Sequence, residues 1–88
     1  MTVPGGASPV RVTLYTREGC HLCEDAAAAL ADLARELPIE VHPIDIDADP
    51  VLKQRFNDVA PAIAVAGQVV TSAPVDIEAV RQAIRQAS

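Results

Sequence analysis

The chain has 88 residues, half of them apolar, with 12 acidic and 7 basic side chains and a net charge of −5. This length suits one small domain with a single core. Scattered basic residues and a negative charge argue against nucleic acid or anionic lipid as a partner. There is no apolar run of about 18 residues that would span a membrane, and residues 1–9 lack the basic start and apolar stretch of a secretory signal. We therefore expect residues 1–9 to be a flexible leader and residues 10–88 to form one monomeric, cytoplasmic domain.

The first predicted elements are a strand, a helix and a second strand. Residues 10–15 alternate in polarity and are rich in β-branched side chains, as in a strand. Residues 21–36 repeat apolar side chains at three- and four-residue steps, which predicts a helix that ends before Pro38. Residues 39–46 form a mostly apolar run, typical of a strand covered on both faces. The predicted inward face of the helix is Leu22, Ala26, Ala29, Leu30, Leu33 and Leu37.

The second half of the chain predicts a short helix, a hairpin and a last helix. Asp49 and Pro50 are typical of a helix cap and the first helical position, with the helix ending near residue 56. Residues 62–66 and 68–71 predict two strands joined around Gly67. Residues 75–87 predict a helix whose buried stripe is Ile77, Val80, Ala83, Ile84 and Ala87. The order βαβαββα predicts an α/β domain, a minimal thioredoxin-like fold with a four-stranded mixed sheet and helices on both faces.

Cys20 and Cys23 are the only cysteines, and they stand where the first strand gives way to the first helix. Two thiols at this spacing can close into a disulfide and reopen, which favours a redox site in a reducing compartment over a structural staple. Unpaired N–H groups and a partial positive charge gather at a helix start. We therefore expect Cys20 to have a lowered pKa and to be the attacking sulfur, with Cys23 as the buried resolving sulfur. His21 either favours the Cys20 thiolate or is a solvated spacer.

Pro61 is the second informative residue. It stands just before a predicted strand, and in this topology that junction faces the amino end of the first helix. A cis bond at this proline would let Ala60 offer its backbone N–H and C=O to an extended substrate beside Cys20.

The chain resembles the glutaredoxin family, and most closely its small glutaredoxin-like proteins. The resemblance runs from about residue 10 into the last helix, and it rests on LYTREGCHLC at residues 14–23, DID at 45–47, VAP at 59–61 and the hairpin around Gly67. It implies a thiol-disulfide oxidoreductase of cell redox homeostasis that reduces protein or small-molecule disulfides.

The resemblance also implies roles for single residues. Cys20 and Cys23 would carry the redox-active disulfide, and Pro61 would be the family's cis proline. Arg17 would lie near a glutathione carboxylate, and Asp76 would stand where a family aspartate follows the hairpin. Two motifs differ from the family pattern. His21-Leu22 stands between the cysteines in place of the usual Pro-Tyr, and Ser72-Ala73 replaces the glycine pair that lets glutathione approach before the last helix. Glutathione and thioredoxin reductase therefore stay equal candidates for the electron donor.

Two rival interpretations remain beside this one. A redox-silent binding module would keep the fold and hold a partner peptide in the groove next to Pro61. A metal or bound cofactor is not expected: Asp45, Asp47 and Asp49 alternate like the start of a calcium loop, but Pro50 takes the position that needs glycine, so capping explains them better. The cysteines and histidines also lack the spacing of a zinc finger.

Overall fold

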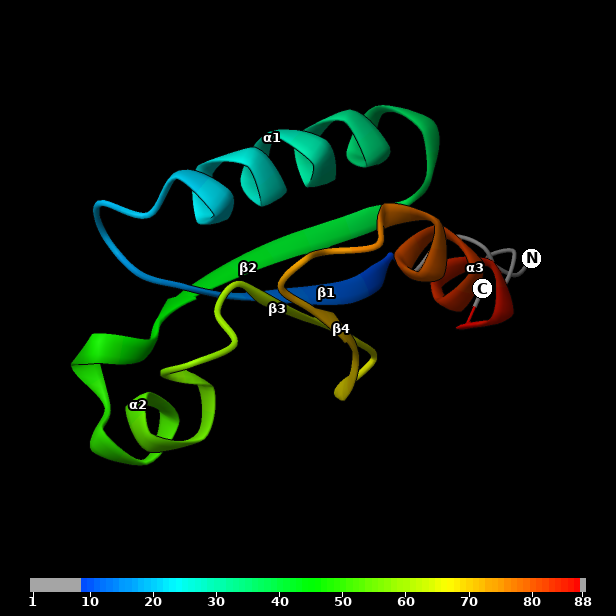
Figure 1. Cartoon of the computed structure of the whole chain (residues 1–88). Coiled ribbons are helices and arrows are strands. Elements are labelled where there is room, and N and C mark those ends of the chain that lie inside the picture. The colour runs from blue at the N-terminus through cyan, green and yellow to red at the C-terminus, as the bar shows by residue number, and fades with distance from the viewer. Residues whose placement is uncertain (1–8, 88) are drawn as a thin grey trace.

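The computed structural model describes residues 9–87, so most of the predicted leader lies outside the described residues. The strands and α-helices follow one another in the predicted order, and a 3-10 turn that was not predicted lies between the second strand and the second helix (Figure 1). They are β1 (Val10–Thr16), α1 (His21–Glu36), β2 (Ile39–Asp45), the 3-10 turn η2 (Ile46–Ala48), α2 (Pro50–Phe56), β3 (Ala62–Val65), β4 (Gln68–Ser72) and α3 (Ile77–Ala87).

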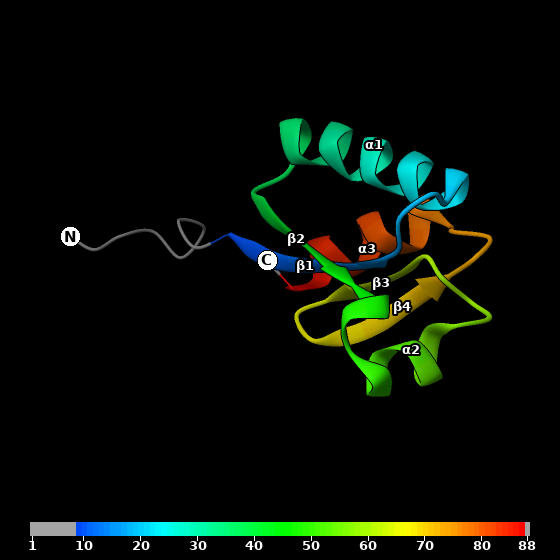
Figure 2. The same ribbon diagram turned by 90° about the vertical axis from the view of Figure 1, so that its left-hand side faces the viewer.

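The four strands form one mixed sheet in the order β2-β1-β3-β4. β1 is parallel to β2 and antiparallel to β3, and β3 is antiparallel to β4. Figure 2 shows α1 and α2 on opposite sides of this sheet. The predicted α/β class, mixed sheet and helices on both faces are therefore confirmed.

Each face of the sheet has its own apolar cluster, because successive residues of a strand point to opposite faces. On one face α1 and α3 pack against β1 and β3; the members of this cluster with 0% exposed surface are Val12, Leu30, Ile63, Val80 and Ile84. On the other face the cluster of Ile46, Phe56 and Ala62 joins η2 and α2 to the end of the sheet. Tyr15 and Phe56 stack there with ring centroids 4.4 Å apart, so both aromatics pack, as predicted.

β2 differs from its prediction. It is an edge strand, and none of its residues is fully buried, so the expectation of a strand covered on both faces is wrong. The reason is that α2 covers the opposite face only where β1 and β3 end, which leaves that side of β2 to solvent. An edge position also explains Pro43, which has no N–H to donate to a neighbouring strand.

The inward face of α1 begins one residue later than predicted. Cys23, Ala26, Leu30 and Leu33 are buried, whereas Leu22 is 56% exposed. Positions 23, 26, 30 and 33 lie on one helical stripe, and Leu22 falls on its flank. The second cysteine is therefore part of the core, and Leu22 stands exposed at the tip of the helix.

The hairpin and the last helix begin and end close to their predicted bounds. Ala66 (φ +51°) and Gly67 (φ +87°) both adopt the left-handed conformation that a tight two-residue hairpin turn requires. α3 begins at Ile77 rather than residue 75, and Ala87 at its end is exposed rather than buried. Within residues 9–87 no helix combines the length and the apolar run needed to cross a membrane.

Candidate active site

Cys20 is the cap of α1. Its backbone is extended (φ −108°, ψ 112°), and its Sγ accepts a hydrogen bond from the N–H of Cys23 at 3.1 Å. Gly19 adopts φ +71°, which turns the chain from the end of β1 into the helix. Both thiols are free; Cys20 is half-buried, and Cys23 is only 2% exposed. One sulfur is thus reachable from solvent and the other lies beneath it, the arrangement that the predicted attacking and resolving roles require.

The pKa of the Cys20 thiol does not follow the prediction. Hydrogen bonding with the Cys23 side chain raises it above its ordinary value, and burial acts in the same direction. The backbone N–H groups of Cys23 and Leu22 lower it, as a helix start should, but they are outweighed. The predicted lowering is therefore wrong, because a second thiol next to Cys20 opposes its ionisation more strongly than the helix start favours it.

The prolyl segment supplies a wall of the site but not all of the predicted contacts. The peptide bond between Ala60 and Pro61 is cis, as is that between Ala73 and Pro74. The N–H of Ala60 donates to the carbonyl of Phe56 at 2.9 Å, so the prediction that it would meet a substrate is wrong. The last turn of α2 continues into this loop and takes that N–H. The role of the Ala60 carbonyl stays a prediction, as does that of His21, which is exposed at the first position of α1.

Arg17 joins the two loops of the site, in a group that we call the Arg17 bridge. Its guanidinium donates to both carboxylate oxygens of Asp47, at 2.6 and 3.2 Å, and to the carbonyl and side-chain oxygens of Asn57, at 3.3 Å each. Arg17 also lowers the pKa of the Asp47 carboxyl. Arg17 stands three residues before Cys20, and Asn57 four before Pro61. The bridge therefore ties the cysteine loop to the prolyl loop.

Sequence reasoning did not find Asp47 and Asn57 as parts of the site. The alternating aspartates at positions 45, 47 and 49 were the sequence feature closest to these contacts, and they were predicted to be capping residues. This is confirmed for two of them: Asp45 accepts a hydrogen bond from the N–H of Asp47, and Asp49 accepts one from the N–H of Val51. Asp47 itself lies 30 residues from Arg17 in the sequence. A local sequence pattern cannot predict an ion pair between residues so far apart in the chain.

Asp76 has a structural partner of its own. Its Oδ1 accepts the N–H groups of Glu78 and Ala79, at 3.0 and 3.2 Å, and its own N–H donates to Thr71. Asp76 therefore caps α3, which explains why this helix starts after it.

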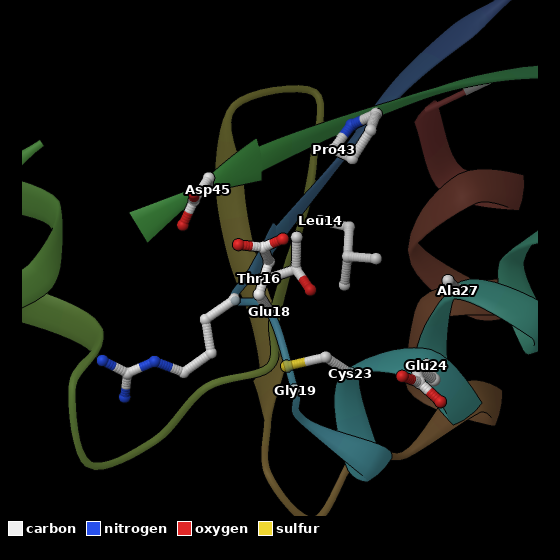
Figure 3. Close-up of a pocket in the computed structure, with 10 residues that line it drawn as sticks. Leu14, Thr16, Glu18, Gly19, Cys23, Glu24, Ala27, Pro43 and Asp45 are labelled. Atoms are coloured by element: carbon white, nitrogen blue, oxygen red, sulfur yellow. The ribbon is translucent and has the colours of Figure 1, made fainter. Parts of the chain in front are cut away.

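A cavity of about 440 Å³ lies between the start of α1 and the ends of β1 and β2. Figure 3 shows the sulfur of Cys23 near this cavity, with the carboxylates of Glu18, Glu24 and Asp45 coming from three different segments. Leu14, Ala27 and Pro43 contribute apolar surface. Within residues 9–87 no three His, Cys, Asp or Glu side chains are grouped so that they could hold a metal ion.

A second hollow of about 320 Å³ lies on the other flank of α1, next to the prolyl loop. Its apolar lining includes Leu22, Ala26, Pro61, Pro74, Val75 and Ile77. An adjoining hollow of about 160 Å³ continues it between the two helices and shares Ala29 and Ile77. We call the two together the α1–α3 groove.

This geometry agrees with comparisons to known proteins. Residues 11–85 match the glutaredoxin-like domain family (DUF836). The chain belongs to this family. The uncharacterized proteins Rv0508 of Mycobacterium tuberculosis and Mb0520 of Mycobacterium bovis are each 35% identical to it over 63 residues, 66% of this chain. The match spans 65% of the length of these relatives.

Solved structures agree on the fold. Protein Ne2328 from Nitrosomonas europaea superposes with a TM-score of 0.80 at 26% identity, covering 93% of this chain and 99% of that one. Protein XcR50 from X. campestris gives 0.69 at 31% identity over 88% and 99%. A thioredoxin variant from Halobacterium salinarum gives 0.67 at 19% identity over 92% and 76%, which shows the fold alone. The glutaredoxin-like domain thus has a thioredoxin-like fold with two adjacent cysteines, which suggests a redox role.

Proposed function

We propose that this glutaredoxin-like domain is a dithiol thiol-disulfide oxidoreductase, with Cys20 as the nucleophile and Cys23 as the resolving cysteine. One observation carries the proposal: a half-buried Cys20 sulfur accepts the N–H of Cys23 at the start of α1, and the Cys23 side chain lies buried one turn further along. Exchange requires one accessible sulfur and a second within reach of it.

The reaction transfers two electrons to the substrate. The Cys20 thiolate attacks one sulfur of the substrate disulfide; the S–S bond breaks, and the released sulfur takes a proton. The Cys23 thiol loses its proton and attacks the Cys20 sulfur, so that the mixed disulfide breaks and the second substrate thiol leaves. The protein then holds a Cys20–Cys23 disulfide. A thiol reductant, either glutathione or a dithiol system such as thioredoxin reductase, returns both sulfurs to thiols.

Single cysteine variants test the roles of the two sulfurs. Cys23→Ser should accumulate a mixed disulfide between Cys20 and a substrate, because nothing ejects the captured sulfur. Cys20→Ser should accumulate none, since Cys23 is buried. Mass spectrometry of the non-reduced variants reads both outcomes, and trapping by Cys20→Ser alone would overturn the assignment.

The electron donor is read from a coupled assay. The oxidised protein is offered reduced glutathione with its reductase, or thioredoxin reductase alone, and consumption of the nicotinamide cofactor is followed. A reducing cytoplasm suits this cycle, because thiols there are kept reduced.

One observation favours a second function, a redox-silent binding module that uses the groove beside Pro61. The pKa of the Cys20 thiol is raised above its ordinary value, which disfavours the thiolate, and a protonated thiol is a poor nucleophile. Under this second function neither reductant would turn the protein over, and a reduced and an oxidised sample would bind the same partner equally well.

A further inference from the structure

The α1–α3 groove begins at the first turn of α1 and at the prolyl loop. Leu22 lies between the two cysteines in sequence and lines the groove, and Pro61 lines it from the prolyl loop. Because Leu22 follows Cys20 by two residues, the residues that flank a disulfide attacked by Cys20 are close enough in the chain to extend into this groove. What the groove offers those residues decides which disulfides are accepted.

The groove has an apolar floor and acidic side chains. Asp25 lines its first part, and Asp32 and Glu36 line the continuation. Arg81, the basic residue of that lining, is bonded to Glu36 and Glu78. Among residues 9–87 no ion pair involves Asp25 or Asp32. An occupant that combines an aliphatic side chain with a positive charge therefore complements this surface.

Glutathione has a net negative charge from its carboxylates, and the group that the family resemblance would offer to one of them, Arg17, is already bonded within the protein. The guanidinium of Arg17 is held by Asp47 and Asn57. The N–H groups of Glu78 and Ala79 at the start of α3 are held by Asp76. A carboxylate in the groove would meet the acidic side chains of Asp25 and Asp32, and Arg81, the basic residue of the described lining, is already paired.

We infer that the α1–α3 groove binds a protein segment whose disulfide cysteine is flanked by a large aliphatic residue and then a basic residue, and that it discriminates against glutathione. This inference rests on the proposed function and names its substrate class. The aliphatic side chain lies against Leu22, Pro61 and Val75, and the basic side chain lies toward Asp25 and Asp32.

The test uses symmetrical peptide disulfides, so that attack on either sulfur is equivalent. Each peptide has one cysteine, followed by Leu-Lys, Ser-Lys or Leu-Glu, and oxidised glutathione is the fourth substrate. The reduced full chain is mixed with each one, and formation of the Cys20–Cys23 disulfide is followed by alkylation and mass spectrometry. One protein dithiol and one peptide disulfide give one protein disulfide and two peptide thiols.

We expect the Leu-Lys peptide to react about tenfold faster than the Ser-Lys peptide, since one aliphatic side chain in an apolar pocket gives discrimination of this order. The Leu-Lys peptide should also react about twofold to fivefold faster than the Leu-Glu peptide at low salt, and the difference between their rates should be smaller at high salt. Leu22→Ser should abolish the difference in rate between the Leu-Lys and Ser-Lys peptides. The double variant Asp25→Asn with Asp32→Asn should abolish the difference between the Leu-Lys and Leu-Glu peptides. Val51→Ser, which removes a 71% exposed aliphatic side chain on α2, should preserve both ratios.

The outcomes separate the two claims. If no disulfide oxidises the protein, the proposed function fails. If all four substrates react at one rate, or glutathione reacts fastest, the groove inference is overturned while the oxidoreductase function stands.

Discussion

Phe56 is expected to hold the prolyl half of the site in place. Phe56 is 3% exposed and packs with Ile46 and Ala62, and its ring stacks on that of Tyr15 with the centroids 4.4 Å apart. Its carbonyl accepts the N–H groups of residues 59 and 60, at 3.1 and 2.9 Å. Truncating this side chain would therefore leave a cavity beneath the loop that leads to Pro61.

The size of the effect follows from this packing. Removing a buried phenylalanine ring costs about 3–5 kcal/mol of folding free energy, and loss of the stacked pair accounts for about 0.5–1.5 kcal/mol beyond area burial. A chain of this size has a total stability of roughly 4–13 kcal/mol. Phe56→Ala should therefore remove a large share of it, which urea unfolding followed by circular dichroism can measure.

A matched variant separates stability from function. Ile84→Ala truncates a fully buried side chain of α3, in the cluster on the opposite face of the sheet, and should cost about 2–5 kcal/mol. Under conditions where both variants stay folded, Phe56→Ala should lose disulfide reductase activity severalfold more than Ile84→Ala. Equal activity losses, or a cost for Phe56→Ala below about 1 kcal/mol, would refute the reasoning.

Three further predictions concern the dithiol and its supports. Cys23→Ala removes the largest cause of the raised Cys20 pKa, so Cys20 should be alkylated faster at neutral pH in this variant. In the protein with both cysteines, the alkylation rate of Cys20 should keep rising with pH beyond the pKa range of an ordinary thiol, because only the thiolate reacts. Arg17→Ala should slow disulfide reduction by about tenfold or more through loss of alignment, whereas Arg35→Ala, which removes an exposed arginine in the last turn of α1, should leave the reduction rate unchanged. Asp49→Ala removes the cap of α2 and should cost about 1 kcal/mol in urea unfolding.

The order of elements could be predicted from the sequence because its signals are local. The period of apolar residues in α1, the Asp49-Pro50 cap of α2 and Gly67 in the hairpin each act within a few residues. The errors fell where tertiary packing decides. The apolar run of β2 could not show that the strand lies at a sheet edge, and the apolar stripe of α1 could not show that Leu22 lies exposed on its flank.

The site was predictable in part for the same reason. Residue type and spacing were enough to identify Cys20, Cys23 and Pro61. In the structure, the start of α1 and the prolyl loop line the same groove. The pKa of Cys20 was not predictable, because it depends on how closely the second thiol approaches it. The hydrogen bond from the Ala60 N–H to the Phe56 carbonyl was also not predictable, because it depends on a turn at the end of α2 that no sequence pattern indicates.

The two apolar clusters explain why the redox site lies where it does. α1, which carries both cysteines, packs on one face of the sheet, and the loop to Pro61 is anchored by Phe56 on the other. Neither cluster alone fixes the position of one loop relative to the other. The Arg17 bridge crosses between them, since it links the segment before Cys20 to Asp47 in η2 and to Asn57 at the end of α2. The Arg17 guanidinium that aligns the two loops is engaged by Asp47 and Asn57, so the proposed discrimination against glutathione would follow from the same contacts that align the site.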